Sequence, residues 1–284
     1  MKVRKLGLIQ QLPADRQLET LSRGLELLVG NVTALMVSLA KLSDPDTQRG
    51  WRVLKQLCEE ESAKCLILLD YLRIPRGRAA DRSRHLKYFY DHFVRCLYAE
   101  YCWIRPSTME NALGWVEQQR PSLYLDGPND VDWIFRNDMI QHREQAMYVD
   151  YVEMDSTPQW IGPEQIEVAG LEEWQIPSRI IELVLCMHRL RLFDAANLAT
   201  IEKEWALESL DPSVEWKHVE AKNRNVLRAA ASLIPNPTKK EMECAQIVAD
   251  EWLFPLGGIE LSQRTVDEEE LRRRQAEYGI GEAL

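Results

Sequence analysis

The sequence contains no hydrophobic run long enough to cross a membrane and no apolar leader at its N-terminus. Residues 1–11 hold only a short apolar stretch, and no segment approaches the roughly 18 consecutive apolar residues that a membrane span requires. We therefore expect neither a secretory signal peptide nor a membrane anchor, and we predict a cytoplasmic protein.

Cysteine pairs with the spacing of metal sites are also missing. The six cysteines are Cys58, Cys65, Cys96, Cys102, Cys186 and Cys244; none forms a C-x-x-C pair, and most fall at apolar positions of predicted helices. We expect buried, reduced thiols rather than zinc ligands or disulfides. There is no glycine-rich Walker loop, and His85 and His92 share a helix face without a third ligand nearby, so neither a metal nor a cofactor is predicted.

Positive charge is in deficit. The chain has 35 Lys and Arg against 45 Asp and Glu, a formal net charge of −10, which argues against a general nucleic-acid coating protein. Segment 73–87 is the exception, with six Lys or Arg and a single acid, Asp81. Its arginines are candidate RNA contacts: Arg76, Arg78, Arg82 and Arg84. A solvated, flexible loop explains the same composition equally well.

Helical periodicity extends over almost the whole chain. Apolar residues recur at three- and four-residue spacing between Leu18 and Leu39, which predicts an amphipathic helix over 14–41. A second helix is expected to end near Leu72 and a third near Ile104. A shorter helix is expected over 108–119, and another is expected to begin near Val131. Segment 148–152 is rich in Tyr and Val and is expected to be extended. Beyond it, helices are predicted over 178–210, 212–234 and 238–254.

These patterns predict an all-α protein, in a chain with the hydrophobic content of 45% that suits a globular core. Pro158, Gly162 and Pro163 mark the best boundary. We expect a helical bundle over 14–165, a helical extension over 166–262, and a charged terminal helix or tail over 263–284.

Two carboxylates fall on predicted apolar faces. At about 100° per residue, Glu61 lies in line with Leu54, and Glu100 lies close to Leu86. A buried carboxylate requires a partner, because it is costly to remove from water unpaired. We interpret these positions as part of a polar network that fixes helix packing, or alternatively as a shell that holds active-site groups. The candidate members are Glu60, Glu61, Lys64, His85 and Lys87.

The strongest catalytic candidate is the run that contains Arg136, Asn137 and His142. Cleaving RNA without a metal needs a base, an acid and a cation that holds the phosphate, and histidine and arginine supply these functions. Six residues apart on a regular helix, Arg136 and His142 would point about 120° apart. Either the helix is irregular there or a second copy of the chain completes the site. Two ordinary surface residues would give the same pattern.

The pattern Arg136-Asn137-x4-His142 resembles the HEPN motif. Other segments resemble AbiV-type abortive-infection proteins of that superfamily. Glu60-Glu61-x-x-Lys64 is similar to their EExxK signature, and His85-Leu86-Lys87 is similar to the His/Lys pair that opens their next long helix. The run from 143 to 151, followed by Trp160, Gly162 and Pro163, resembles the family's ending. The resemblance covers roughly residues 15–165.

The resemblance implies a HEPN-like helical bundle followed by additional C-terminal helices. It also implies a homodimer in which two Arg/His motifs meet in a cleft. The expected activity is metal-independent RNA cleavage that leaves a cyclic phosphate, in abortive-infection antiphage defence or as a toxin. His142 would then be the base or acid, Arg136 would stabilise the phosphorane, Asn137 would orient, and Arg143 would add an RNA contact.

The expected partners are RNA, a second copy, and a protein antitoxin or phage-encoded trigger. One alternative is a non-catalytic HEPN-like dimeric module that binds a protein partner. A further alternative is a regulatory helical scaffold whose basic segment 73–87 docks an acidic protein.

Overall fold

The computed structural model describes residues 5–42, 45–125, 133–134, 137–154, 157–163, 178–206 and 211–277. Over these ranges, α-helices dominate, with two short 3-10 helices, η1 (Leu6–Gln11) and η2 (Pro45–Thr47), and two small antiparallel pairs of strands. The predicted all-α class is confirmed. No helix in the described part of the chain is long and apolar enough to cross a membrane.

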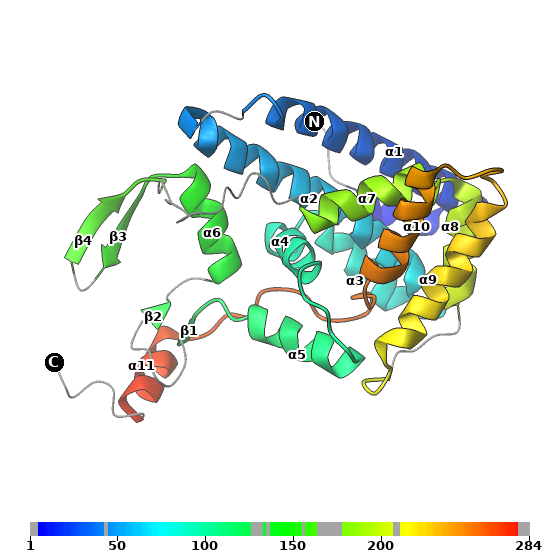
Figure 1. Ribbon diagram of the computed structural model, residues 1–284. Coiled ribbons are helices and arrows are strands. Elements are labelled where there is room, and N and C mark those ends of the chain that lie inside the picture. The colour runs from blue at the N-terminus through cyan, green and yellow to red at the C-terminus, as the bar shows by residue number, and fades with distance from the viewer. Residues whose placement is uncertain are drawn as a thin grey trace.

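Two long helices form the frame of the molecule, α1 (Ala14–Leu39) and α2 (Gln48–Arg73), and they lie side by side (Figure 1). Both match the predicted helices. In α1, Leu21, Leu25, Val29 and Val32 are buried, as their three- and four-residue spacing requires. The C-terminal half of α2 is buried on nearly all sides because helices from both ends of the sequence cover it. Helix α2 is therefore the centre of the core.

The prediction of a single helix that ends near Ile104 is wrong. Two helices occupy this segment, α3 (Ala79–Tyr88) and α4 (His92–Tyr101). Asp91 lies between them with extended backbone angles (φ −88°, ψ 120°), and its carboxylate accepts a hydrogen bond from the Val94 N–H at 3.3 Å. An aspartate in this position caps a new helix rather than continuing the old one. The break changes the direction of the chain between the two apolar patterns.

The helix expected over 178–210 also divides, into α7 (Arg179–Arg189) and α8 (Ala195–Trp205). Arg191 adopts the left-handed region at φ 59°, and the side-chain amide of Asn197 donates to its carbonyl at 2.7 Å. A left-handed residue ends a helix by turning the chain away from its axis. The other two predictions are confirmed by α9 (Trp216–Ala231) and α10 (Lys239–Glu251).

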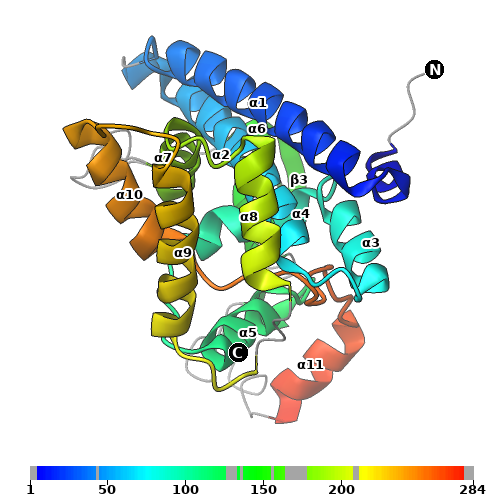
Figure 2. The same cartoon turned by 90° about the vertical axis from the view of Figure 1, so that its right-hand side faces the viewer.

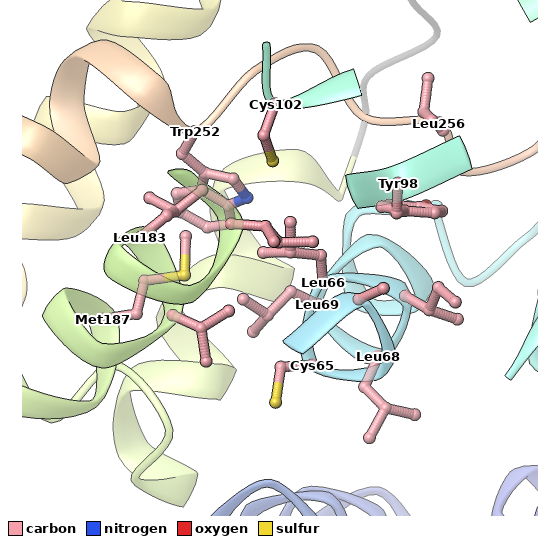
Figure 3. Close-up of a cluster of buried hydrophobic side chains, with 14 of the residues drawn as sticks. Cys65, Leu66, Leu68, Leu69, Tyr98, Cys102, Leu183, Met187, Trp252 and Leu256 are labelled. Atoms are coloured by element: carbon pink, nitrogen blue, oxygen red, sulfur yellow. The ribbon is translucent and has the colours of Figure 1, made fainter. Parts of the chain in front are cut away.

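The C-terminal helices share one core with the N-terminal bundle. In Figure 3, Leu66 and Leu69 of α2 lie with Leu183 and Met187 of α7, and Trp252 closes the cluster from the segment after α10. All six cysteines are free and buried, as predicted. The boundary near residue 160 stays a prediction, since residues 164–177 lie outside the described ranges.

Several smaller elements follow α4 and precede α7 in the sequence. Helix α5 (Met109–Gln119) matches its prediction, whereas the helix expected from Val131 begins later, as α6 (Asp138–Met147). Strand β1 (Tyr124–Leu125) pairs with β2 (Trp133–Ile134), and β3 (Asp150–Met154) pairs with β4 (Thr157–Ile161). Strand β3 confirms the predicted extended segment. The β3–β4 hairpin projects from the helical body, and α11 (Glu268–Glu277) forms the predicted charged terminal helix (Figure 1).

Candidate functional site

Asn137 fixes the start of α6, the helix on which the predicted motif lies. It is buried, and its side-chain Oδ1 accepts from the Ile140 N–H at 3.4 Å, which caps the helix. Its Nδ2 donates to the carbonyls of Gln119 at 2.6 Å and Pro121 at 2.9 Å. The amide therefore ties the first turn of α6 to the end of α5. This is a positioning role.

Arg136 lies outside the described residues, and so does the side chain of His142. Helix α6 begins at Asp138, after the Asn137 cap, so Arg136 precedes the helix. The angle of about 120° assumed one regular helix and does not apply. The catalytic roles of Arg136 and His142 stay predictions.

Beside α6, three side chains meet at the buried carboxylate of Glu60. We call these four residues the Glu60 cluster: Glu60, His92, Arg95 and Arg143. Glu60 on α2 is only 3% exposed. Its Oε2 lies 2.8 Å from the Nδ1 of His92 and 2.9 Å from the Nη1 of Arg95, both on α4. Its Oε1 accepts from the Nε of Arg143, on α6, at 2.8 Å. One carboxylate thus joins α2, α4 and α6.

The Glu60 cluster carries more positive than negative charge. Two guanidinium groups face one carboxylate, so the cluster is cationic even with a neutral imidazole, in a chain of net charge −10. Burial alone would lower the pKa of the Arg143 guanidinium, but its hydrogen bond to Glu60 and the Glu60 charge outweigh this and raise that pKa. A fixed cationic site of this kind attracts phosphate.

His92 is the exposed member of the cluster, with 51% of its side chain accessible. When a carboxylate accepts a hydrogen bond from the Nδ1–H of a neutral imidazole, the proton stays on Nδ1 and Nε2 keeps its lone pair. Nε2 is then the nitrogen that can take a proton from a ligand or return one. The arrangement provides an oriented acid–base group beside two guanidinium groups.

The predicted burial is confirmed in part for Glu61 and is wrong for Glu100. Glu61 is half-buried and pairs with Lys64, while its neighbour Glu60 is fully buried. Leu54, the reference for the apolar face, is likewise only partly buried. Glu100 is exposed because the break at Asp91 shifts the phase of α4 relative to Leu86 on α3.

The five residues predicted to form one polar network lie in different parts of the structure. Glu60 belongs to its own cluster, Glu61 and Lys64 form a local pair, and Lys87 is exposed. His85 is 1% exposed, and its Nε2 lies 3.1 Å from the carbonyl of Ile67. Burial lowers the pKa of His85 to about 4, against the opposing charge of Asp70, so its imidazole is neutral at pH 7.

A second buried carboxylate, Asp70, lies further along α2 and forms what we call the Asp70 network: Asp70, Arg73, His85 and Tyr98. Asp70 Oδ2 accepts from the Tyr98 hydroxyl at 2.7 Å and from the backbone N–H of Leu256 at 2.8 Å. Its Oδ1 accepts from Arg73 at 3.0 Å. The Tyr98 hydroxyl lies 3.5 Å from His85 Nε2.

The Asp70 network holds the segment after α10 against α2. Arg73 donates to the carbonyl of Leu253 at 2.9 Å, and its guanidinium lies 4.2 Å and 4.7 Å from the ring centroids of Trp205 and Trp252. A Cβ on Gly257 would lie 2.8 Å from the carbonyl oxygen of Asp70, so only glycine permits this approach. The network is closed to solvent, and its role is structural.

The basic segment is folded rather than a flexible loop, because its second half forms α3. Arg76 and Arg82 both bind Glu202 of α8, at 2.6 Å and 2.9 Å. Arg82 is buried, with its guanidinium 4.1 Å from the ring centroid of Tyr71. Arg82 thus attaches α3 to α8, and Arg76 attaches the turn before α3 to the same helix. Their proposed RNA contact stays a prediction.

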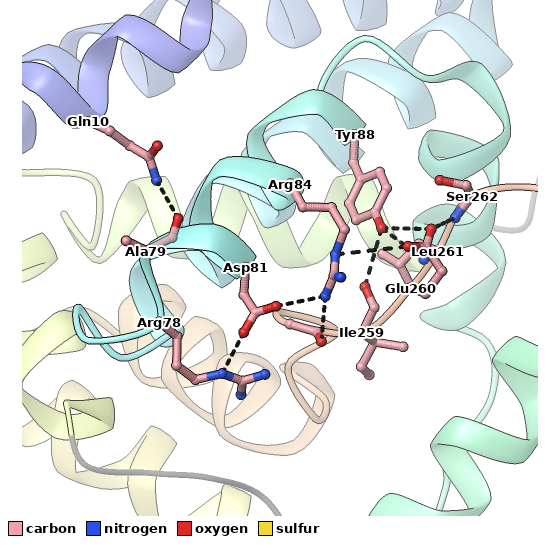
Figure 4. A network of polar contacts seen from close by, with 11 residues as sticks. Gln10, Arg78, Ala79, Asp81, Arg84, Tyr88, Ile259, Glu260, Leu261 and Ser262 are labelled. Carbon is pink, nitrogen blue, oxygen red and sulfur yellow. Dashed lines mark hydrogen bonds and ion pairs between the residues drawn. The ribbon is translucent and has the colours of Figure 1, made fainter.

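Figure 4 shows the other side of the same segment. Asp81 accepts from Arg78 at 2.6 Å and from Arg84 at 2.8 Å, and Arg84 also donates to the carbonyl of Gly258 at 3.0 Å. The backbone N–H of Leu261 donates to the hydroxyl of Tyr88 at 3.0 Å. These charges are largely neutralised within the protein, which leaves less basic surface than the composition suggests.

His92 and Arg95 were not predicted as residues of this site. They are three residues apart, so they share one face of a helix, and Asp91 caps that helix directly before them. That spacing was the available signal, but nothing local connects the pair to Glu60 or Arg143. Within the described residues, no group of three or more His, Cys, Asp or Glu side chains could hold a metal ion.

Comparison of the chain with protein-family models, with curated proteins and with solved structures gives no match. The functional interpretation therefore depends on the motif residues and on the geometry of the Glu60 cluster.

Proposed function

We propose that this protein is a metal-independent endoribonuclease of the HEPN type, similar to AbiV abortive-infection proteins, that acts in the cytoplasm in antiphage defence. The observation that carries the proposal is the Glu60 cluster. A buried carboxylate there orients a half-exposed imidazole beside two guanidinium groups, next to α6, the helix that Asn137 caps and in which position 142 of the Arg136-Asn137-x4-His142 motif falls.

The proposed reaction breaks an RNA phosphodiester without a metal. A base removes the 2′-hydroxyl proton, the O2′–phosphorus bond forms, and the phosphorus–O5′ bond breaks while an acid protonates O5′. The products are a 2′,3′-cyclic phosphate and a 5′-hydroxyl. Imidazole is the side chain best suited to take a proton and to return one near neutral pH. We assign these transfers to His142 and His92, and phosphorane stabilisation to Arg136.

Two contacts on α6 support the role of His142. Asn137 fixes the start of the helix, and Arg143, the residue after His142, binds Glu60 at 2.8 Å. A catalytic side chain needs a backbone held to within about half an ångström, which contacts on both sides of it provide. Glu60 would thus position both imidazoles, one through His92 directly and one through Arg143.

The exposed face of the β3–β4 hairpin supports the proposed homodimer. Tyr151 and Trp160 are cross-strand partners with ring centroids 5.0 Å apart, and Trp160 is 72% exposed. Tyr148 and Val149 are also exposed. Contiguous exposed apolar side chains mark protein contacts. Because the hairpin follows α6 directly, a second copy docked there would bring two motifs close together.

The test is cleavage of a fluorescent single-stranded RNA by the full chain in the presence of EDTA. Cleavage should yield fragments ending in a 2′,3′-cyclic phosphate, identified by mass spectrometry. Arg136→Ala and His142→Ala should each abolish cleavage while the far-UV circular dichroism spectrum is unchanged. His218→Ala, an exposed histidine of α9, is the matched control. Full cleavage by folded His142→Ala protein would contradict the proposal.

His92→Ala separates the acid–base role of His92 from a structural one. Loss of a general acid or base lowers the rate about 10²–10⁴-fold and removes one limb of the pH–rate profile. A merely structural residue would alter stability and leave the shape of that profile unchanged.

The alternative is a non-catalytic dimeric module that binds a protein partner, and the exposed aromatic face of the hairpin favours it independently of any catalytic group. In that case, no RNA would be degraded even at high protein concentration. A stable complex with a protein partner would form and would be lost in Trp160→Ala.

A further inference from the structure

A groove lies between α1, α2, α7 and α10, apart from the residues of the Glu60 cluster. Its volume is about 870 Å³, within the range of about 300–1,000 Å³ that small-molecule sites occupy. Helices α7 and α10 lie next to each other there, beside α1 and α2 (Figure 2). The apolar part of the lining consists mainly of Met36, Leu39, Trp51, Ile181 and Leu185.

Ser178 lines this groove and has an unsatisfied hydroxyl. It occupies the N-cap position of α7, where serine normally accepts a hydrogen bond from the first turn. Here the side chain makes no cap bond, and its Oγ has no partner among the described residues, although Ser178 is only 6% exposed. Burying a hydroxyl without a partner is unfavourable. A ligand group that pairs with this hydroxyl removes that cost.

The N-terminus of α7 lies at the same place. The first intrahelical bond of α7 runs from the N–H of Glu182 to the carbonyl of Ser178 at 3.0 Å, so the N–H groups before Glu182 are not used within the helix. Such N–H groups and the helix dipole favour an anion. The unpaired hydroxyl and the helix N-terminus are two separate features, and both favour a negatively charged group that accepts hydrogen bonds.

The charged residues of the lining also favour an anion. Lys55, Arg189 and Lys240 stand against Glu182 and Glu241 in a chain of net charge −10, and Lys55 is paired with Glu59 at 2.8 Å, which leaves Arg189 and Lys240 as the cations of the groove. Glu241 is engaged in its own capping box with Thr238, so its carboxylate is committed to α10. The groove therefore combines an apolar surface with a local excess of positive charge.

We propose that this groove binds an amphipathic monocarboxylate, with its aliphatic or aromatic body on the apolar lining and its carboxylate at Ser178 and the N-terminus of α7. The ligand receives a hydrogen bond from the Ser178 hydroxyl and relieves the unpaired buried group. This site is independent of the RNA-cleaving function proposed above.

The test is a calorimetric titration of the full chain with decanoate, and with 1-decanol as a ligand that has the same tail and no charge. Decanoate should bind at least tenfold more tightly than decanol. Ser178→Ala should weaken decanoate binding about tenfold, the loss of one hydrogen bond to a charged group, and leave decanol unaffected. Ser232→Ala on α9 is the matched control.

The apo protein separates ligand binding from a structural role of Ser178. Removing a hydroxyl that has no partner should leave the melting temperature of ligand-free Ser178→Ala unchanged or raise it, while decanoate affinity falls. Leu185→Trp should fill the groove and abolish binding of both ligands, and Met36→Trp serves where Leu185→Trp does not fold. No decanoate binding at 1 mM, or equal affinities for decanoate and decanol, would overturn the proposal.

Discussion

The two buried carboxylates of α2, Glu60 and Asp70, have similar partners and different surroundings. Each binds arginine, and each has a histidine in its group: His92 beside Glu60 and His85 beside Asp70. His92 is half-exposed, whereas His85 is buried and neutral. The same residue types therefore form an accessible, cationic cluster in one place and a sealed network in the other.

The origin of the partners explains the difference. Asp70 binds the backbone N–H of Leu256, and Arg73 binds the backbone carbonyl of Leu253, in the segment after α10. Their side chains therefore fix this segment against α2 and do not face solvent. Among the described residues, the Glu60 carboxylate binds the side chains of its cluster, and two guanidinium groups share its single negative charge. The same residue types thus differ in solvent access and in net charge, and these two properties are the reason that the Glu60 cluster and not the Asp70 network is the candidate site.

The largest effect is expected from Asp70→Asn, which removes the charge facing Arg73. A buried pair that loses one partner destabilises a protein by about 3–5 kcal/mol, because the remaining charge stays buried. Urea unfolding measures the loss. Asp81→Asn, the same change at a partly exposed aspartate, should cost about 1 kcal/mol or less. Similar losses in both variants would remove the distinction between a sealed and an accessible network.

Acid pH should act on the Asp70 network through His85. Its folded-state pKa of about 4 lies below the ordinary 6.5, so the unfolded chain binds the proton more readily. Stability is then full above pH 6.5 and falls as the pH drops towards 4, by up to about 3 kcal/mol. Unfolding free energies of wild type and His85→Gln across this range test the prediction. An identical slope in both would exclude His85 as the cause.

A stability loss of about 2–3 kcal/mol, smaller than that of Asp70→Asn, is expected from Glu60→Gln: Arg143 and His92 can reach water once the charge is removed, whereas the guanidinium of Arg95 stays buried. On the proposed function, RNA cleavage should nevertheless fall about 10–100-fold, since the carboxylate positions both imidazoles. Stability and cleavage are measured on the same preparation. Unchanged cleavage together with a loss as large as that of Asp70→Asn would make both carboxylates structural.

The smallest effect on stability is expected outside both groups, at Trp160. Replacing this exposed side chain by alanine should change the free energy of unfolding by about 0.5 kcal/mol or less. If the hairpin is the dimer contact, light scattering should show a shift from dimer to monomer. Trp103→Ala, another exposed tryptophan, is the control. A Trp160→Ala dimer as tight as wild type would place the contact elsewhere.

Much of the fold follows from periodicity, and the exceptions have local causes. Helices α1, α2, α5, α9 and α10 match their predicted ranges closely, because an apolar repeat of about 3.6 residues reports a buried face directly. The missed breaks arise where Asp91 caps a new helix and where Arg191 turns left-handed. Apolar spacing continues across both positions and conceals them.

The site was predictable in part. Asn137, Glu60 and Arg143 were named from the sequence, and all three are engaged in fixing α6 or the cluster beside it. His92 and Arg95 were not, because their approach to Glu60 depends on how α4 packs against α2. Such long-range packing has no signature in local spacing.

The segment from Leu253 to Leu261 determines when the protein can finish folding. Its backbone supplies partners to Arg73 and Asp70 on α2 and to Tyr88 on α3, which are synthesised far earlier. Until this segment has left the ribosome, Asp70, Arg73 and Tyr88 lack these backbone partners, and the C-terminal half of α2 remains partly exposed to water. A chain terminated before Leu253 should therefore be cleaved faster by proteases than the full chain.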